Sequence, residues 1–591
     1  MVDPYRMIII NASASLLLLL YFLITKYIFK KRTNYPLLLL LISLLPLLSL
    51  LRKGAYESGD FNLHIYRAMA FFDSLKEGLF MPSWAADLNA TYGYPLFVFV
   101  NPLPYYLISF FHLLGFSFIG SLKLYFAFSY IASGIFMYLF TKKIFKNDLA
   151  AFTSSIFYLF VPYHLVDLHF RTTIGEIFVF TLIPLILLNF FYLVSKKKLI
   201  FMFSSGLFLA LLFMTHQGIS VFVLVMILSF LIFSLKKNNE LNLNSARLIL
   251  PAFIIGAILS SYTWLPYLYL AQYTLTHKLS SQIVSFPDFA ELIISPWRNG
   301  LLFQGPKGEL SYIIGYTQLA VIIFSAIQLF TGKLTKKIST NLWFWLLFFL
   351  SVLFMITPLS AFIWNNVPLI NALQFSTRLL LLLSFCSSII AGYLVLSLIK
   401  RKKILFLILI LTISYTILNW GHRKVIPEFS DQTLRGNLPK STAEGEGLAY
   451  IGNSKWWKDK NLWINKIPKN RIEIIEGEGQ IKEISRSSIK HGYIINSDKK
   501  LTIKDNTVFF PGWKVKINGK EVPIINDYQK SEALIVCNAS KGLSYVEVSY
   551  NDLPLHKASK VISIIGFISV FFFLFYQLTT ALLRKKRMKL F

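Results

Sequence analysis

The chain has 591 residues, of which 55% are hydrophobic and only 15% are charged, and its formal net charge is +30 at pH 7. Soluble globular proteins do not show this balance, so the composition predicts an integral membrane protein. The basic residues occur in short clusters between apolar segments, which argues against a nucleic-acid-binding surface.

Apolar segments of about 17 to 25 residues recur along the chain and predict about thirteen transmembrane helices. The first is long, has no obvious small-residue cleavage site and precedes a basic cluster, so we expect an uncleaved span and not a signal peptide. The expected spans are 7–29, 34–51, 122–141, 149–166, 174–194, 199–215, 219–235, 247–268, 313–331, 341–357, 375–399, 403–420 and 560–583.

Clusters of Lys and Arg lie between these spans, and all of them fall on one side of the predicted topology. The positive-inside rule assigns that side to the cytoplasm. This requires 103–118 to be an interfacial or re-entrant helix, because one more crossing would place every later cluster outside. We therefore expect a multi-pass plasma-membrane protein with a cytoplasmic C-terminal tail. The clusters are at 30–32, 142–146, 196–198, 236–237, 333–337, 400–403 and 584–587.

Two regions of polar composition are expected on the outer face. The first is the loop 52–121, within a predicted transmembrane domain 1–420. The second, 421–559, is long enough for an independent domain, and it precedes a last span and basic tail in 560–591.

The outer region 421–559 alternates with period two at 471–475, 513–517 and 545–550, which predicts antiparallel strands. Asn518-Gly519 predicts a hairpin, because both turn positions need positive φ. The expected fold is mainly α and polytopic, with a β-sandwich-like outer domain before the last span.

Polar side chains gather at the expected outer ends of the spans, although a charge at a helix centre costs roughly 2.5 to 3.5 kcal/mol. Side chains of both signs at one membrane face suit a cavity that holds an anionic group and moves a proton. These residues are Asp60, His64, Arg67, His164, Asp167, His169, Arg171, Glu176, His216, Gln217, Gln374 and Arg378.

The arginines among them suit a phosphate, because a guanidinium can donate paired hydrogen bonds to its oxygens. Asp60 can take a proton from an acceptor hydroxyl, or bind a divalent cation together with Asp167 or Glu176. Arg378 lies one turn inside a span, which suits either a site residue or a side chain that snorkels to the surface.

Structural interpretations stand beside the functional ones. Asp60 precedes a helical segment and is also a candidate N-cap. His64 and Arg67 also suit an interfacial anchor. His164 with Asp167 is more often a structural hydrogen bond than a metal site.

Six short motifs stand out along the chain. They contain Gly59-Asp60-Phe-Asn-Leu-His64-Ile-Tyr-Arg67, Gly93-Tyr94-Pro95, Asn101-Pro102-Leu-Pro104, Thr215-His216-Gln217, Leu373-Gln-Phe-Ser-Thr-Arg378 and Phe510-Pro511-Gly512-Trp513. Together they resemble motifs of GT-C type multi-spanning membrane glycosyltransferases. The closest resemblance is to membrane proteins labelled as related to 6-pyruvoyl-tetrahydropterin synthase, and nothing in the sequence indicates a pterin.

The resemblance implies that Asp60 is the catalytic base or metal-facing carboxylate and that 103–118 is a juxtamembrane helix. His64, Arg67 and Arg378 would face the phosphate of a polyprenyl-phosphate sugar donor. Asp60 is not followed by a second acid, so the paired acidic motif of some GT-C enzymes is incomplete. Dependence on Mg or Mn therefore stays open.

The leading hypothesis is a glycosyltransferase that moves a sugar from this donor to a cell-envelope glycan, lipid or protein at the outer face. His164, Asp167, Arg171, Glu176 and His216 are candidates for supporting or metal-binding roles. Two alternatives are a transporter or flippase of lipid-linked saccharides, and a non-catalytic envelope protein whose outer domain binds polysaccharide.

Overall fold

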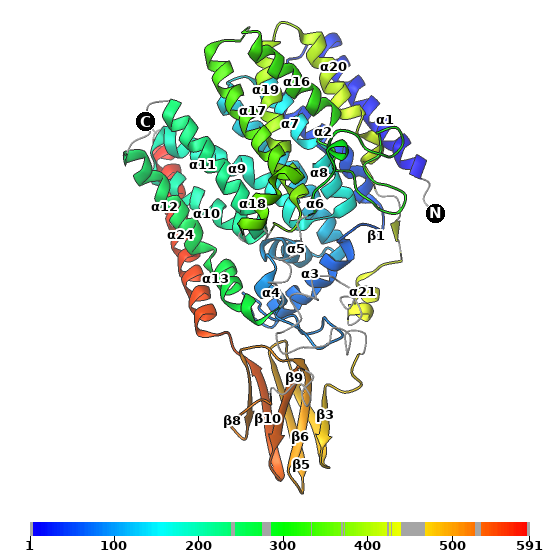
Figure 1. Cartoon of the computed structure of the whole chain (residues 1–591), viewed down its shortest axis with the longest axis vertical. Helices are drawn as coiled ribbons and strands as arrows, with labels where there is room; N and C mark the ends of the chain where they lie inside the picture. Colours follow the sequence, from blue (N-terminus) through cyan, green and yellow to red (C-terminus); the bar gives the residue numbers. More distant parts are fainter. Residues whose placement is uncertain are drawn as a thin grey trace.

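The computed structural model describes residues 4–237, 243–274, 285–332, 334–367, 370, 373–421, 425–426, 428–438, 467–525 and 533–587. A large helical bundle occupies one end of the molecule and a strand domain the other, with α3, α4 and α5 between them (Figure 1). Lys333 and the last residues of the basic tail lie outside the described residues. The expected mainly α fold with a β-domain before the last helix is confirmed.

The described helices run in chain order from α1 to α21, followed by the final helix α24. Their bounds are α1 Pro4–Leu23, α2 Tyr35–Leu44, α3 Phe61–Lys76, α4 Leu96–Phe99, α5 Leu103–Leu113, α6 Phe118–Phe145, α7 Asp148–Leu159, α8 Pro162–Val166, α9 Ile174–Lys196, α10 Leu199–Thr215, α11 Gln217–Lys237, α12 Leu243–Leu259, α13 Ser261–Leu270, α15 Phe289–Ile293, α16 Tyr316–Phe330, α17 Lys336–Ile356, α18 Ala361–Asn366, α19 Leu380–Ser397, α20 Lys402–Ser414, α21 Asp431–Asn437 and α24 Pro554–Arg587.

Within the described residues, 8 helices are long and apolar enough to cross a membrane, and 2 bent helix pairs, α7 with α8 and α12 with α13, have the composition of further spans. The expected spans 34–51, 199–215 and 313–331 form apolar helices of 17 residues or fewer. A straight crossing needs about 20 residues, so these three are short by that measure. In the first, Pro46 lies where the α-helix gives way to the 3-10 turn Leu45–Leu51.

The helix α5, expected at 103–118, has only 11 residues. At 1.5 Å per residue it is far too short to cross a bilayer. It packs against α3 and α6. The prediction of a non-spanning helix at this place is confirmed by its length.

The strand domain consists of two antiparallel sheets, with strand orders β4-β5-β10-β7-β8 and β3-β6-β9. The predicted hairpin joins β7 and β8, where Asn518 has φ +48° and Gly519 has φ +82°. A two-stranded sheet of β1 and β2 lies apart from this domain. The bounds are β1 Ala55–Tyr56, β2 Val425–Ile426, β3 Ile472–Glu476, β4 Gln480–Arg486, β5 Lys490–Ser497, β6 Leu501–Val508, β7 Trp513–Ile517, β8 Lys520–Val522, β9 Leu534–Ala539 and β10 Gly542–Tyr550.

The strand domain and the loop 52–121 share one hydrophobic core. Trp84 and Phe99 from the loop belong to the same cluster of buried residues as Trp513 and Val546 from the strands. The rings of Trp84 and Trp513 meet edge to face, with their centroids 5.1 Å apart. Buried aromatic area dominates the energetics of such contacts. The loop therefore packs as part of a domain that follows it by about 370 residues in the chain.

Candidate active site

The bent span α7–α8 presents polar residues at the end of the bundle nearest the first outer loop. The chain bends by 48° at the break before Pro162, which cannot donate the helical hydrogen bond. A π-helical turn Asp167–Arg171 follows directly, and such turns often occur at functional sites. Here Arg171 Nη1 donates to the Tyr163 hydroxyl at 2.6 Å and to Asp167 Oδ1 at 3.0 Å.

Glu176, in the first turn of α9, is the centre of a buried ion cluster. Its carboxylate lies 3.0 Å from Arg171 Nη2 and 3.2 Å from Arg378 Nε. The Tyr163 hydroxyl also donates to it. The Glu176 side chain is only 1% exposed, and the two guanidinium side chains are 14% and 15% exposed. Residues far apart in sequence therefore form one ionic unit.

Arg378 is brought next to His216, the residue between α10 and α11. The backbone N–H of Ile219 donates to His216 Nδ1 at 3.2 Å, so a neutral ring carries its proton on Nε2. This Nε2 lies 3.5 Å from Arg378 Nη1. Two donors face each other here, and an acceptor oxygen placed to one side of the pair would satisfy both. The buried ion pair with Glu176 shows that Arg378 does not snorkel to the surface.

Asp60 is held against the end of the π-helical turn by its backbone. The N–H of Gly59 donates to Phe170 O at 2.9 Å and that of Asp60 to Arg171 O at 3.0 Å. A Cβ at Gly59 would lie 3.2 Å from Arg171 O, so a glycine suits this close approach. Asp60 occupies the N-cap position of α3, but its side chain makes no capping hydrogen bond. The N-cap position expected for Asp60 is confirmed, but without a side-chain capping bond.

Burial raises the pKa of the Asp60 carboxyl above its ordinary value, and the charges of Arg171, Arg67 and Arg378 oppose that rise. Glu176 adds to it. The positive charges of three guanidiniums therefore act on the Asp60 carboxyl. Its side chain makes no capping hydrogen bond to α3. A carboxylate in this setting can accept a proton near the oxygens of a bound anion.

His64 and Arg67, one and two turns along α3, are not surface anchors. Arg67 is 8% exposed and lies beside the hydroxyls of Tyr105 and Tyr94. His64 Nδ1 is 3.2 Å from the Tyr105 hydroxyl. Burial and the charge of Arg67 lower the pKa of His64 to about 3, so this ring is neutral at physiological pH. The interfacial interpretation of Arg67 is therefore wrong.

His164 contacts residues outside the ion cluster. Its ring stacks on Phe180, with centroids 3.9 Å apart and planes within 3°, and its Nδ1 lies 3.0 Å from Tyr158 O. These contacts give His164 a packing role in the bundle. The His164–Asp167 pair expected from the sequence is replaced by the pair of Asp167 with Arg171.

Within the described residues, no group of three or more His, Cys, Asp or Glu side chains is placed to hold a metal ion. Asp167 and Glu176 are both paired with Arg171, so they do not fit a set of cation ligands beside Asp60. Dependence on a divalent cation stays a prediction.

Tyr163 is a member of the cluster that the sequence reasoning missed. The signal was present, because Tyr163, Asp167 and Arg171 are spaced by four residues and so lie on one helix face. A phenol in an apolar segment is easily taken for an interfacial residue, and only the tertiary structure reveals its hydrogen bond to Glu176 in α9.

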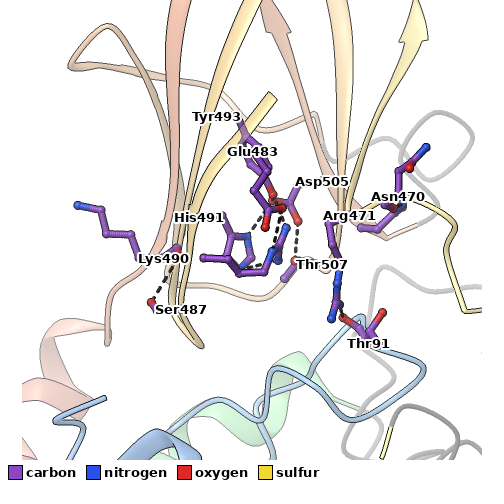
Figure 2. Close-up of polar contacts among 12 residues, drawn as sticks. Thr91, Asn470, Arg471, Glu483, Ser487, Lys490, His491, Tyr493, Asp505 and Thr507 are labelled. Carbon is purple, nitrogen blue, oxygen red and sulfur yellow. Dashed lines mark hydrogen bonds and ion pairs between the residues drawn. The ribbon is translucent and has the colours of Figure 1, made fainter. Parts of the chain in front are cut away.

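A second polar network, also missed, lies inside the strand domain (Figure 2). His491 Nδ1 donates to Asp505 Oδ2 at 2.8 Å, and the Tyr493 hydroxyl donates to the same oxygen at 2.6 Å. Thr507 Oγ1 donates to Asp505 Oδ1 at 2.6 Å. Arg486 Nη1 lies 3.1 Å from His491 Nε2, and its donation fixes a neutral ring protonated at Nδ1.

Burial alone would raise the pKa of Asp505, but His491 and Arg486 hold it below its ordinary value. A depressed folded pKa contributes stability above the unfolded pKa of about 3.9, and this is lost as pH falls through the folded value. We expect Asp505→Asn to cost about 2 kcal/mol at pH 7, because a buried charge-assisted hydrogen-bond network is weakened. Hydrogen exchange of β6 in the full chain, compared with the wild type at equal pH, measures this.

The difference in stability between the two proteins should begin to narrow below about pH 4, where the carboxyl of the unfolded wild type becomes protonated, and it should close as pH falls through the lower folded pKa. An equal difference at pH 7 and at pH 3 would contradict the assigned role of Asp505.

These elements define a polytopic membrane protein with a buried ion cluster at one end of its bundle, next to a β-domain. No protein family profile matches the sequence. The chain is 24% identical over 352 residues to an uncharacterized protein of Lactococcus lactis subsp. cremoris (strain MG1363), which covers 57% of this chain and 55% of that one. It thus spans about half the length of this curated relative.

Among solved structures, the chain is similar to the cryo-EM structure of the arabinofuranosyltransferase AftD from Mycobacteria. The TM-score is 0.41 and the sequence identity 15%, over 67% of this chain and 27% of that one.

Proposed function

We propose that the protein is a membrane glycosyltransferase of the GT-C type, which transfers a sugar from a polyprenyl-phosphate donor to a cell-envelope acceptor at the outer face. The observation that carries the proposal is the pair of facing donors, His216 Nε2 and Arg378 Nη1, 3.5 Å apart. A phosphate oxygen placed to one side of this pair, within hydrogen-bond distance of both nitrogens, would accept from both. The charge of Arg378 also acts on the Asp60 carboxyl.

The reaction follows from these positions. The acceptor hydroxyl attacks the anomeric carbon of the donor sugar, and the Asp60 carboxylate takes the hydroxyl proton. The bond between the anomeric carbon and the phosphate oxygen breaks, and its electron pair leaves on the polyprenyl phosphate. Arg378 and Arg171 stabilise the negative charge that develops on that oxygen, while Glu176 fixes both guanidiniums in place.

The test is a transfer assay with the purified protein in proteoliposomes, supplied with a radiolabelled polyprenyl-phosphate sugar and an envelope extract. We expect a labelled acceptor product and release of polyprenyl phosphate. Counterflow of labelled donor without any covalent product would show a transporter instead. Product formed by the wild type but not by vesicles lacking the protein is the required control.

A further inference from the structure

The strand domain and the first outer loop enclose a pocket of about 100 Å³ at their junction. It lies at the turn of the β4–β5 hairpin, above the loop that carries Thr91 (Figure 2). Arg471 and Arg486 come to it from the strand domain, and Glu77 and Asp87 from the loop. No residue of the ion cluster around Glu176 lines this pocket, and the proposed transfer reaction does not involve it.

The charges of the pocket are balanced. Arg471 Nη2 lies 3.4 Å from Asp87 Oδ1, and Arg486 Nε lies 3.1 Å from Glu483 Oε2. Glu483 lies outside the pocket lining, and the second carboxylate of the lining is that of Glu77, which accepts from a backbone N–H of the hairpin turn. Without excess positive charge, the pocket does not favour an anion. Planar donors and acceptors in balanced number suit a neutral ligand with several hydroxyls.

The loop under the pocket has an unusual backbone. Asn89, Ala90 and Thr91 have φ of 60°, 52° and 73°, in the left-handed region that residues with a Cβ rarely occupy. Contacts from the strand domain hold it there. Arg471 Nη1 donates to Thr91 O, and the N–H of Val508 donates to Tyr92 O at 3.0 Å. Strain maintained by its surroundings is concentrated at ligand sites.

We propose that this pocket binds one neutral sugar unit. Its volume is below the roughly 300–1,000 Å³ of sites that enclose a whole drug-sized ligand, so it takes one unit of a longer molecule. Hydroxyl groups pair with the arginine donors and carboxylate acceptors of the rim, and the hydroxyl of Thr507, which also lines the pocket, lies deeper.

The position of the pocket defines the acceptor, a step that rests on the proposed glycosyltransferase function. Asp60 precedes α3 and Glu77 follows it, and this length of helix separates them by roughly 25 Å. A sugar in the pocket is therefore not the reacting unit. The acceptor is a glycan chain, one unit of which is held at the strand domain while its end reaches Asp60.

Binding is tested by saturation-transfer NMR with the full-length protein in detergent micelles. The probes are the methyl glycosides of glucose, galactose and N-acetylglucosamine, with methyl glucuronide as the acidic counterpart. We expect signal from at least one neutral glycoside. Asp87→Asn, at a side chain 53% exposed, should raise Kd at least tenfold, because one carboxylate oxygen that accepts from hydroxyls is replaced by an NH2 donor and the negative charge that strengthens the other hydrogen bond is lost.

The matched control is Glu521→Gln, which removes the carboxylate of the exposed pair with Lys514 in the same domain. Its Kd should equal that of the wild type, and the thermal midpoints of all three proteins should agree. The proposal is overturned if the wild type binds no neutral glycoside, if it binds only the glucuronide, or if Asp87→Asn binds as the control does.

This outcome is separable from that of the proposed function. Asp60→Asn should bind the glycosides with unchanged Kd, since Asp60 lies outside the pocket. If the wild type binds a glycoside but transfers no sugar, the proposed glycosyltransferase function is refuted and the proposed sugar-binding pocket stands. Transfer without binding would refute the sugar site alone.

Discussion

Asp60→Asn should lower kcat/KM for sugar transfer by at least 100-fold. Asparagine has nearly the same shape but cannot take the proton of the acceptor hydroxyl, and a positioned general base contributes about 10²–10⁴-fold. The side chain makes no capping bond to the helix, so the substitution should not disturb α3. The transfer assay with the polyprenyl-phosphate donor measures the effect, and the thermal midpoint checks the fold.

Asp73→Asn provides the control on the same helix. Asp73 pairs with Arg435 near the other end of α3, away from the cluster, and its loss should leave transfer within about twofold of the wild type, as for a partly exposed pair. Because burial raises the pKa of Asp60, kcat/KM should rise with pH through that raised value and then level off, as the base must be deprotonated. Asp60→Asn with wild-type turnover would refute the role of base.

Glu176→Gln should be the most destabilising single substitution in the cluster. The Glu176 carboxylate neutralises Arg171 and Arg378, whose side chains are only 14% and 15% exposed. Removing one partner of a buried ion pair leaves uncompensated charge and costs about 3–5 kcal/mol. Thermal unfolding in detergent, followed with a thiol-reactive dye at the buried Cys386 in a background where Cys537, the other buried free cysteine, is replaced by Ser, should show a markedly lower midpoint.

The matched substitution for this experiment is Glu521→Gln, since the pair of Glu521 with Lys514 is about half exposed. Exposed pairs contribute about 0–1 kcal/mol, so its midpoint should be close to that of the wild type. Equal midpoints for the two variants would show that Glu176 is not the centre of the cluster.

The sequence predicts best what depends on local signals. Hydropathy alone locates the long spans, and the Asn518-Gly519 turn alone locates a hairpin. The positive-inside rule is a weaker signal, but it suffices to predict that α5 does not span the membrane. Its length of 11 residues is too short for a crossing.

The candidate site was predicted only in part, since its geometry depends on packing between distant helices. Asp60, Arg171, Glu176 and Arg378 were named from their expected common membrane face, and the structure brings them together. Which carboxylate pairs with which guanidinium could not be read from one sequence. His164 was misplaced because its partner is a ring in α9, Phe180, and no spacing rule reports such a stack.

The shared core of loop and strand domain makes the two a single cooperative folding unit. Trp84 is 1% exposed only because Trp513 and Tyr550 cover it, and Lys560 at the start of α24 reaches back to Ser83 Oγ at 2.7 Å. A truncation that removed the strands would expose this aromatic surface and destabilise the segment around Trp84 that packs on it. The function of the strand domain should therefore be tested with single substitutions at the rim of its pocket, made in the intact chain.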